Sequence, residues 1–142
     1  MSRLLFVLLM CPTLAMGQQT QLPNDIDLKA AYCIPIARNA SQVTVYQNLP
    51  EPFRNSFQDT KDKGAANLRR LNLYLLPRLS QLSAMPLIGA SKSAEEDLER
   101  TMAEITQCDR TSPVEKALKC MTMETEAMKR VRSCKVLSFL PF

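Results

Sequence analysis

The sequence contains no histidine and no tryptophan, and aromatic residues make up only 6% of its 142 positions. The absence of histidine excludes the common catalytic triads, haem attachment through CxxCH and the zinc sites of HExxH proteases. The GxSxG sequence of hydrolases and the glycine-rich loops that bind phosphate are also missing. These absences predict a non-enzymatic protein that needs no cofactor.

Glycine is scarce, with three residues against nine prolines, which argues against an all-β fold rich in hairpin turns. The hydrophobic fraction of 46% is enough for one core in a chain of this length. No apolar run approaches the ~20 residues that a membrane-spanning helix needs. We therefore expect an all-α fold, a small disulfide-braced bundle of about four helices, with no stable membrane span.

The first residues, MSRLLFVLLMCPTLAMGQQ, have the features of a secretory leader. A single cation, Arg3, precedes a short apolar run, and Ala15 and Gly17 form the small-residue pattern of a cleavage site. We expect cleavage after Gly17 and export of a single domain, residues 18–142, to the periplasm or the cell exterior. Removal of Arg3 leaves a net charge of about +3, which does not indicate a nucleic-acid partner.

The mature chain retains four cysteines, an even number that suggests two disulfides in an oxidising compartment. Cys120 and Cys134 would lie ~21 Å apart on one continuous helix, too far to pair. The favoured set is Cys33 with Cys134 and Cys108 with Cys120. No two cysteines have the CxxC spacing of redox enzymes, so these disulfides are interpreted as structural.

Helical periodicity and capping signals divide the mature chain into four expected helices. Asn24 or Asp25 caps the first, and Ser93 and Ser112 cap the last two. Pro35 and Pro77 fall opposite the apolar stripes of their helices, where they would produce kinks rather than breaks. The expected helices span residues 24–47, 51–82, 93–107 and 112–134, with a loop at 83–93.

The last of these helices has a broad apolar face that includes Cys120, Met123 and Cys134. Its width suits a core helix packed against two neighbours, with methionine filling irregular gaps. A soft-metal site is the alternative, because thiolate and thioether ligands select Cu(I). The ligands of that weaker alternative would be Cys120, Met121, Met123 and Met128.

Glu124 is the one charged residue in the middle of this apolar face, and a buried carboxylate needs a partner. Arg69 and Arg78 are candidates for a buried ion pair, and a ligand pocket around Glu124 is the functional alternative.

Two segments are expected to expose apolar side chains to a protein partner. One is the loop around residues 85–88, and the other is the apolar C-terminal tail, residues 137–142. The residues of this possible partner surface are Met85, Leu87, Ile88, Leu137, Phe139, Leu140 and Phe142.

These observations favour an exported protein that acts by protein–protein interaction or has a structural role. A carrier of lipids or hydrophobic ligands is an alternative, and it predicts an interior cavity lined by leucines and methionines. A four-helix secreted signalling protein also fits the size and the disulfides, and Asn39, in the sequence Asn-Ala-Ser, would then be a candidate glycosylation site. The partner and the oligomeric state are not determined by these patterns.

Overall fold

The computed structural model describes residues 20–111 and 125–142, and these residues form the all-α fold expected from the sequence. Four α-helices lie in the described ranges, and a short 3-10 turn, η1, spans Leu76–Arg78. Within the described ranges, the β-type backbone pairing is a single isolated bridge between Gln21 and Leu82. The helices are α1 (Asp25–Ser41), α2 (Glu51–Leu75), α3 (Ala84–Thr111) and α5 (Glu126–Ser133).

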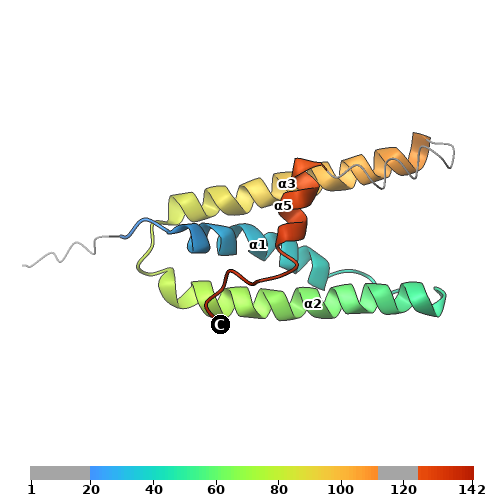
Figure 1. Ribbon diagram of the computed structural model, residues 1–142, viewed down its shortest axis with the longest axis horizontal. Helices are drawn as coiled ribbons and strands as arrows, with labels where there is room; N and C mark the ends of the chain where they lie inside the picture. Colours follow the sequence, from blue (N-terminus) through green and yellow to red (C-terminus); the bar gives the residue numbers. More distant parts are fainter. Residues whose placement is uncertain (1–19, 112–124) are drawn as a thin grey trace, which may run out of the picture.

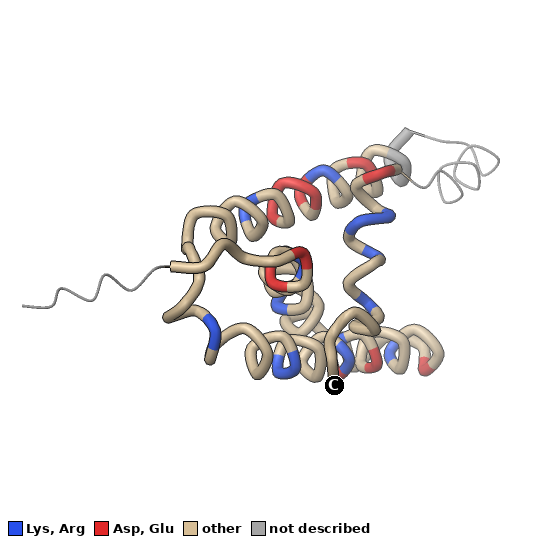
Figure 2. The backbone as a smooth tube through the Cα atoms, turned by 60° about the vertical axis from the view of Figure 1, so that its left-hand side comes forward, with Lys and Arg blue, Asp and Glu red and all other residues tan. Residues whose placement is uncertain are grey.

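Helix α1 lies at the centre of the bundle, between α2 and α3 (Figure 1). Its small buried residues, among them Ala30, Cys33 and Ala37, let the neighbouring helices approach closely. α5 crosses from α3 towards α2, and the last residues of the protein lie against α2 (Figure 2). The main core cluster consists of Ala30, Cys33, Ile36, Ala37, Leu71, Ala94, Cys134, Leu137 and Leu140.

Helix α1 begins with a capping box and ends earlier than expected. The Asn24 side chain accepts a hydrogen bond from the Asp27 amide at 2.8 Å, and the Asp27 carboxylate accepts one from the Asn24 amide at 3.1 Å. The expected end at Gln47 was wrong, because α1 stops at Ser41. The run Val43-Thr44-Val45 follows, and its β-branched residues have low helix propensity.

Pro35 lies inside α1 and is buried, although we expected it on the exposed face of that helix. The expectation assumed one buried face. α1 instead contacts α2 and α3 on different sides, so most of its circumference is covered.

Helix α2 ends at Leu75 rather than Leu82. Pro77 has no amide hydrogen with which to continue the helical hydrogen bonds, and the backbone passes through η1 there. The Leu79 amide then bonds the carbonyl oxygens of Leu75 and Leu76, and the Ser83 amide bonds Gln21. Pro77 therefore terminates the helix instead of kinking it.

Helix α3 begins at Ala84, so residues 84–93 of the expected loop are helical and Ser93 is not the cap of this helix. Pro86 lies in the first turn, where amide groups have no partner within the helix and proline is tolerated. Leu87 is buried with Ala31, Leu75 and Leu82 in a second core cluster. This burial offsets the low helix propensity of Pro86 and Gly89, a tertiary effect that the sequence pattern did not reveal.

The expected helix 112–134 is interrupted at Thr125, whose backbone is extended, with φ −72° and ψ 161°. The Thr125 hydroxyl accepts a hydrogen bond from the Met128 amide at 3.2 Å and so caps α5. Residues 112–124 of that expected helix lie outside the described residues.

Cys33 and Cys134 form a disulfide with a Cα–Cα distance of 5.4 Å, as the favoured pairing required. The bond joins the centre of α1 to the end of α5 across 101 residues of sequence. Both cysteines are buried in the main core cluster. The segment that follows α5 is thereby fixed to the bundle, and Leu137 and Leu140 complete the core.

Candidate functional site

The N-terminal half of α2 extends beyond the body of the protein (Figure 1). None of the residues 51–63 is buried, and Gly64 is the first buried position along the helix. At Gly64 the end of α1 touches α2 so closely that an added Cβ would lie 2.5 Å from the Ser41 amide nitrogen. Residues 51–63 are therefore the part of α2 that extends beyond the end of α1. We call them the α2 arm.

The α2 arm carries the core-facing stripe of α2 into solvent. Phe57 and Phe53 precede Gly64 by seven and eleven residues, which places them on the same helical face as the buried Leu71 and Leu75. Their exposed fractions are 41% and 62%. Two aromatic side chains at core positions thus have too little of the described protein packed against them to bury them.

The C-terminal half of α3 has the same property. Leu87 and Ala94 are buried and Leu98 is partly buried, but Ile105, seven residues further along that face, is 50% exposed. Met102, beside it, is also exposed. Both exposed stripes follow from helix length, because α1 has 17 residues whereas α2 and α3 have 25 and 28.

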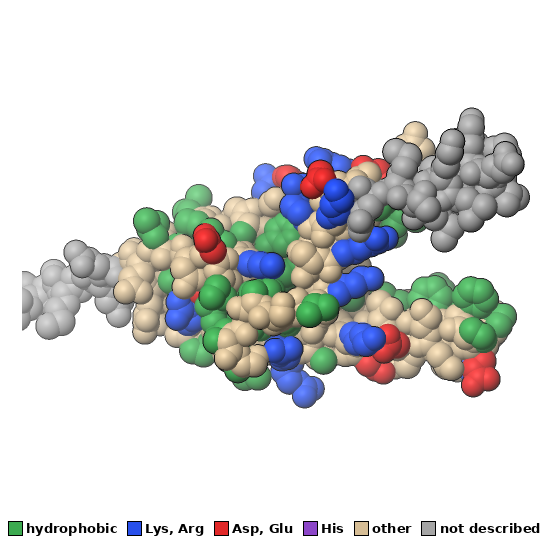
Figure 3. Space-filling view, in the orientation of Figure 1, with side chains coloured by type: hydrophobic (Ala, Val, Ile, Leu, Met, Phe, Trp, Pro, Cys, Tyr) green, Lys and Arg blue, Asp and Glu red, His purple; other side chains and the backbone are tan. Residues whose placement is uncertain are grey.

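α2 and α3 both extend past the end of α1 (Figure 1), and a hollow lies along the α2 arm next to residues 125–135 in the space-filling view (Figure 3). We call this hollow the open cleft. Residues 42–50 connect the end of α1 to the start of α2 and run along the α2 arm, so they occupy part of the space beyond α1 (Figure 1).

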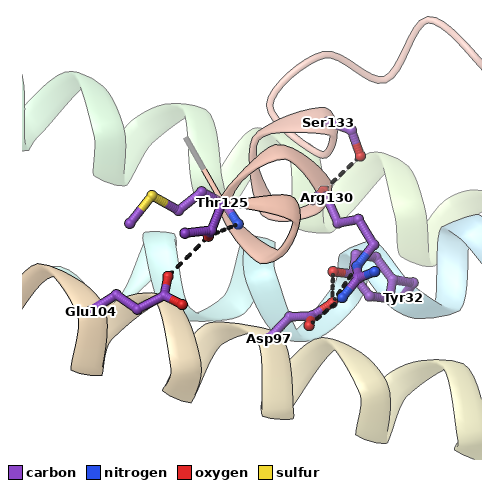
Figure 4. Close-up of polar contacts among 7 residues, drawn as sticks. Tyr32, Asp97, Glu104, Thr125, Arg130 and Ser133 are labelled. Atoms are coloured by element: carbon purple, nitrogen blue, oxygen red, sulfur yellow. Dashed lines mark hydrogen bonds and ion pairs between the residues drawn. The ribbon is translucent and has the colours of Figure 1, made fainter. Parts of the chain in front are cut away.

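The closed end of the open cleft is formed by residues 125–135, which contain α5 (Figures 2 and 3). At the α3 side, the Thr125 hydroxyl donates a hydrogen bond to Glu104 at 2.9 Å, and Arg130 binds Asp97 (Figure 4). At the α2 side, the Asn67 amide donates to the carbonyl oxygens of Cys134 and Lys135, at 3.3 and 3.2 Å. α5 therefore acts as a crossbar between the two helices.

The crossbar is rich in cations. Residues 126–135 contain four basic side chains and a single acidic one, Glu126. Glu126 pairs with Lys129 at 2.7 Å, and Arg130 pairs with Asp97 of α3. Blue side chains line the crossbar in the space-filling view, next to the hollow (Figure 3).

Asp97 is the main anchor of the crossbar. Its carboxylate accepts two hydrogen bonds from Arg130, both 2.8 Å, and one from the Tyr32 hydroxyl at 2.7 Å (Figure 4). The hydrogen bonds from Arg130 lower the pKa of Asp97 against the opposing effect of burial. Burial, followed by the neighbouring Asp97, raises the pKa of Tyr32 to about 12.

A second cluster of the same composition lies on the α1–α2 side. Asp27 is fully buried and accepts hydrogen bonds from Arg78 at 2.8 and 3.1 Å and from Tyr74 at 3.0 Å. Burial alone would raise the pKa of Asp27, but the hydrogen bonds from Arg78, the Asn24 amide and Tyr74 outweigh it, so the pKa is lowered. Both aspartates are ionised and fully paired, which suits structural ties rather than proton transfer.

These two Asp–Arg–Tyr clusters were not predicted. Tyr32 and Asp97 are 65 positions apart in sequence, and Asp27 and Arg78 are 51 apart, so no local spacing indicates either contact. The capping box around Asn24 was the one local signal, because it points to Asp27 as a hydrogen-bonded carboxylate.

The structure describes only the two arginines of the buried ion pair that we expected around Glu124. Glu124 lies outside the described residues. Arg78 is engaged by Asp27, and Arg69 is exposed on α2. Arg69 contributes to an open groove of about 590 Å³ along α2 beside the end of α1, lined by Ser41, Ala65, Leu68, Arg69, Asn72, Leu73, Leu76 and Pro77.

The expected apolar partner surface is wrong in part. Leu87, Leu137 and Leu140 are buried in the core, and Phe139 packs against it. The tail is fixed there by the Cys33–Cys134 disulfide and by the Arg70 guanidinium, which donates to the Phe142 carbonyl oxygen. Met85, Ile88 and Phe142 are exposed as expected.

The possible soft-metal ligands Cys120, Met121 and Met123 lie outside the described residues, as does the side chain of Cys108. Met128 is on α5 and is half-buried. Within residues 20–107 and 125–142, no group of three or more His, Cys, Asp or Glu side chains is arranged to hold a metal ion.

Comparison with known proteins gives no assignment, because no protein family, curated protein or solved structure matches the sequence. Among the helices of the described part of the protein, none combines the length and the apolar character that crossing a membrane requires.

Proposed function

We propose that this chain is an exported, non-enzymatic protein that binds a partner protein in the open cleft. The exposure of Phe53 and Phe57 carries this proposal. Large aromatic side chains at core-facing helical positions are a frequent source of binding energy when a partner buries them.

The frame around the open cleft supports a binding role. The disulfide, the Asp97–Arg130 pair and the contacts of Asn67 fix the crossbar to three different helices. A preformed cleft loses less conformational entropy on binding than a mobile one, so more of the contact energy becomes affinity. A disulfide of this kind is also compatible with an oxidising compartment outside the cytoplasm.

Site-specific photo-crosslinking in the producing organism tests this proposal. A benzophenone amino acid is placed at Phe57 in one variant and at Ile88, an exposed position in the first turns of α3, in a second variant. We expect a discrete crosslinked protein adduct from position 57 and none from position 88.

Replacement of Phe53 by serine should then reduce the adduct formed at position 57 while the far-ultraviolet circular dichroism spectrum stays unchanged. Adducts from position 88 alone would place the partner on the surface expected from sequence, and the open cleft would be the wrong site. No adduct from either position would contradict a stable protein partner.

A further inference from the structure

The open groove along α2, beside the end of α1, has the composition of a small-molecule site. Five of its eight lining residues are apolar, and Arg69 is the one charged residue among them. We propose that this groove binds a long-chain fatty acid, with the acyl chain against the leucines and the carboxylate at Arg69. This inference does not depend on the open cleft, because the groove uses residues 65–77 and the open cleft lies along residues 51–63.

The groove occupies a third face of α2, apart from the two faces that contact the rest of the protein. Leu71 and Leu75 are buried in the core. Asn67 and Arg70 donate hydrogen bonds to the C-terminal segment, and the Tyr74 ring lies 6.2 Å from that of the last residue. None of these five residues lines the groove, so neither the core nor the C-terminal tail covers it.

Leucine side chains on this third face are exposed to solvent. Leu73 and Leu76 line the groove with exposed fractions of 65% and 61%, and Leu79, just beyond Pro77, is 43% exposed. A solvent-facing helical surface normally carries polar side chains. From Arg69 to Pro77 the groove follows about 12 Å of helix, at about 1.5 Å per residue. An extended acyl chain along this length would remove the leucines from water, which favours binding.

The size of the groove suits a small lipid better than a protein. Its volume of about 590 Å³ falls in the range of about 300–1,000 Å³ that is typical of small-molecule sites. A stable protein interface uses about 20–30 residues on each side, whereas eight residues line the groove.

The charges around the groove favour an anionic head group. No acid occurs in residues 28–50 or 63–94, which contain seven basic residues between them. The nearest acids along α1 and α2 are Asp27, which is paired with Arg78, and Asp62, which accepts a hydrogen bond within its own helix at 2.9 Å. In the groove lining, an anionic head group therefore finds a cation, and a cationic head group finds no acid.

Arg69 is the cation available to this head group. Arg70 and Arg78 are already engaged, by the carbonyl oxygen of the last residue and by Asp27. Arg69 is exposed, and its guanidinium has no hydrogen-bond or ion-pair partner within residues 20–107 and 125–142. Asn72 also lines the groove and lies three residues further on, on the same side of the helix. A guanidinium can donate two parallel hydrogen bonds to one carboxylate, which gives the head group a defined position.

Two amphiphiles with the same acyl length test the inference on the mature protein. Dodecanoate and dodecyltrimethylammonium are titrated separately in a calorimeter, below the concentrations at which they form micelles. We expect one dodecanoate per protein, bound at least about fivefold more tightly than the ammonium compound, because only the carboxylate can pair with Arg69. Equal affinities, tighter binding of the ammonium compound or no binding of dodecanoate would overturn the inference.

Matched variants assign the binding to the groove. R69Q should weaken dodecanoate about fivefold or more and leave the ammonium compound unchanged, whereas K92Q, at an exposed position of α3, should change neither. L73S/L76S should weaken both compounds about tenfold or more, and I88S, which removes an exposed apolar side chain outside the groove, should have no effect. The circular dichroism spectrum should be unchanged in all four variants. Equal losses of dodecanoate affinity in R69Q and K92Q would show that Arg69 does not hold the head group.

Photolabelling locates the acyl chain directly. A fatty acid with a diazirine near the end of its chain is irradiated with the protein, and the labelled peptides are identified by mass spectrometry. We expect the label within residues 68–79. Label confined to residues 51–63 would place the fatty acid in the open cleft and contradict the groove as its site. Crosslinking at position 57 tests the partner protein separately.

Discussion

Arg130 and Asp97 are joined by two hydrogen bonds of 2.8 Å, in which Nε and one terminal nitrogen of the guanidinium each meet a different carboxylate oxygen. This two-point contact fixes the direction in which α5 leaves α3. The crossbar therefore depends on a buried carboxylate of a neighbouring helix as well as on the disulfide. Loss of either anchor should be measurable in stability.

Asp97→Asn should destabilise the protein by about 1–3 kcal/mol, because Arg130 and Tyr32 lose an ionised partner in a buried position. Glu96→Gln is the matched control, since Glu96 is the exposed neighbour on the same helix. Urea unfolding followed by circular dichroism measures both variants. Equal midpoints for the two variants would mean that the Asp97 cluster is not an anchor.

The stability of the protein should fall in acid. Asp27 and Asp97 both have a pKa below the usual value in the folded state, so their contribution is complete above the unfolded pKa of about 3.9. It is lost as the pH falls from there through the lower folded pKa, because protonation removes the charge that the arginines pair with. Urea midpoints measured between pH 7 and pH 2 should show this loss, and Asp97→Asn should show a smaller one.

Gly64→Ala should destabilise the protein although alanine favours helices. The added Cβ would lie 2.5 Å from the Ser41 nitrogen and 2.7 Å from the Ala40 carbonyl carbon, both backbone atoms that cannot move aside without shifting α1. Gly89→Ala is the control, because no atom lies within 4 Å of its added Cβ, and it should stabilise α3 by up to about 1 kcal/mol. Thermal unfolding of both variants should therefore shift in opposite directions.

Removal of the Cys33–Cys134 disulfide by double substitution with alanine should cost about 2–5 kcal/mol, because the bond closes a loop of about 100 residues. The C-terminal segment should lose most protection, since Leu137 and Leu140 then depend on packing alone. Hydrogen exchange of residues 134–142 measures this local effect. Unchanged exchange there would show that packing suffices to hold the tail.

We predict a second disulfide between Cys108 and Cys120. The contacts of Glu104 with Thr125 and of Asp97 with Arg130 place the start of α5 beside α3. Cys108 and Cys120 are the two cysteines of the expected mature chain that remain after the Cys33–Cys134 disulfide, and the even number of cysteines favours their pairing. Mass spectrometry of the exported protein, alkylated before and after reduction, should find no free thiols and a polypeptide that begins at Gln18. Free thiols at both positions would exclude this disulfide and favour the soft-metal alternative.

The secondary structure could be predicted from sequence wherever local chemistry decided it. The cap of α1, expected at Asn24 or Asp25 and found at Asn24, the start of α2 at Glu51 and the apolar stripe of α2 all rest on residues close together in the sequence. The start of α3 could not be predicted, because the burial of Leu87 against α1 and α2 outweighs the helix-breaking tendency of Pro86 and Gly89.

In the candidate site, too, the sequence predicts the features that depend on local spacing and misses those that depend on tertiary contacts. Helical periodicity in the sequence groups Phe53 and Phe57 with Leu71 and Leu75 on one face of α2. Periodicity does not report the length of a helix relative to its neighbours, so it could not show that α1 ends at Ser41, beside Gly64 of α2, and leaves the two phenylalanines exposed. The C-terminal tail was expected to be exposed because no local pattern shows its burial. That burial depends on a disulfide and on contacts with a helix that is distant in the sequence.

The sequence by itself therefore determined the helical class, the expectation of export and the favoured Cys33–Cys134 pair, because composition, a leader pattern and helix geometry are local or global properties of the polypeptide. Tertiary structure alone decided which apolar residues are buried and where the open cleft lies. It also created the Asp27–Arg78 and Asp97–Arg130 pairs, because these contacts join residues 51 and 33 positions apart whose side chains meet only when three helices pack around α1.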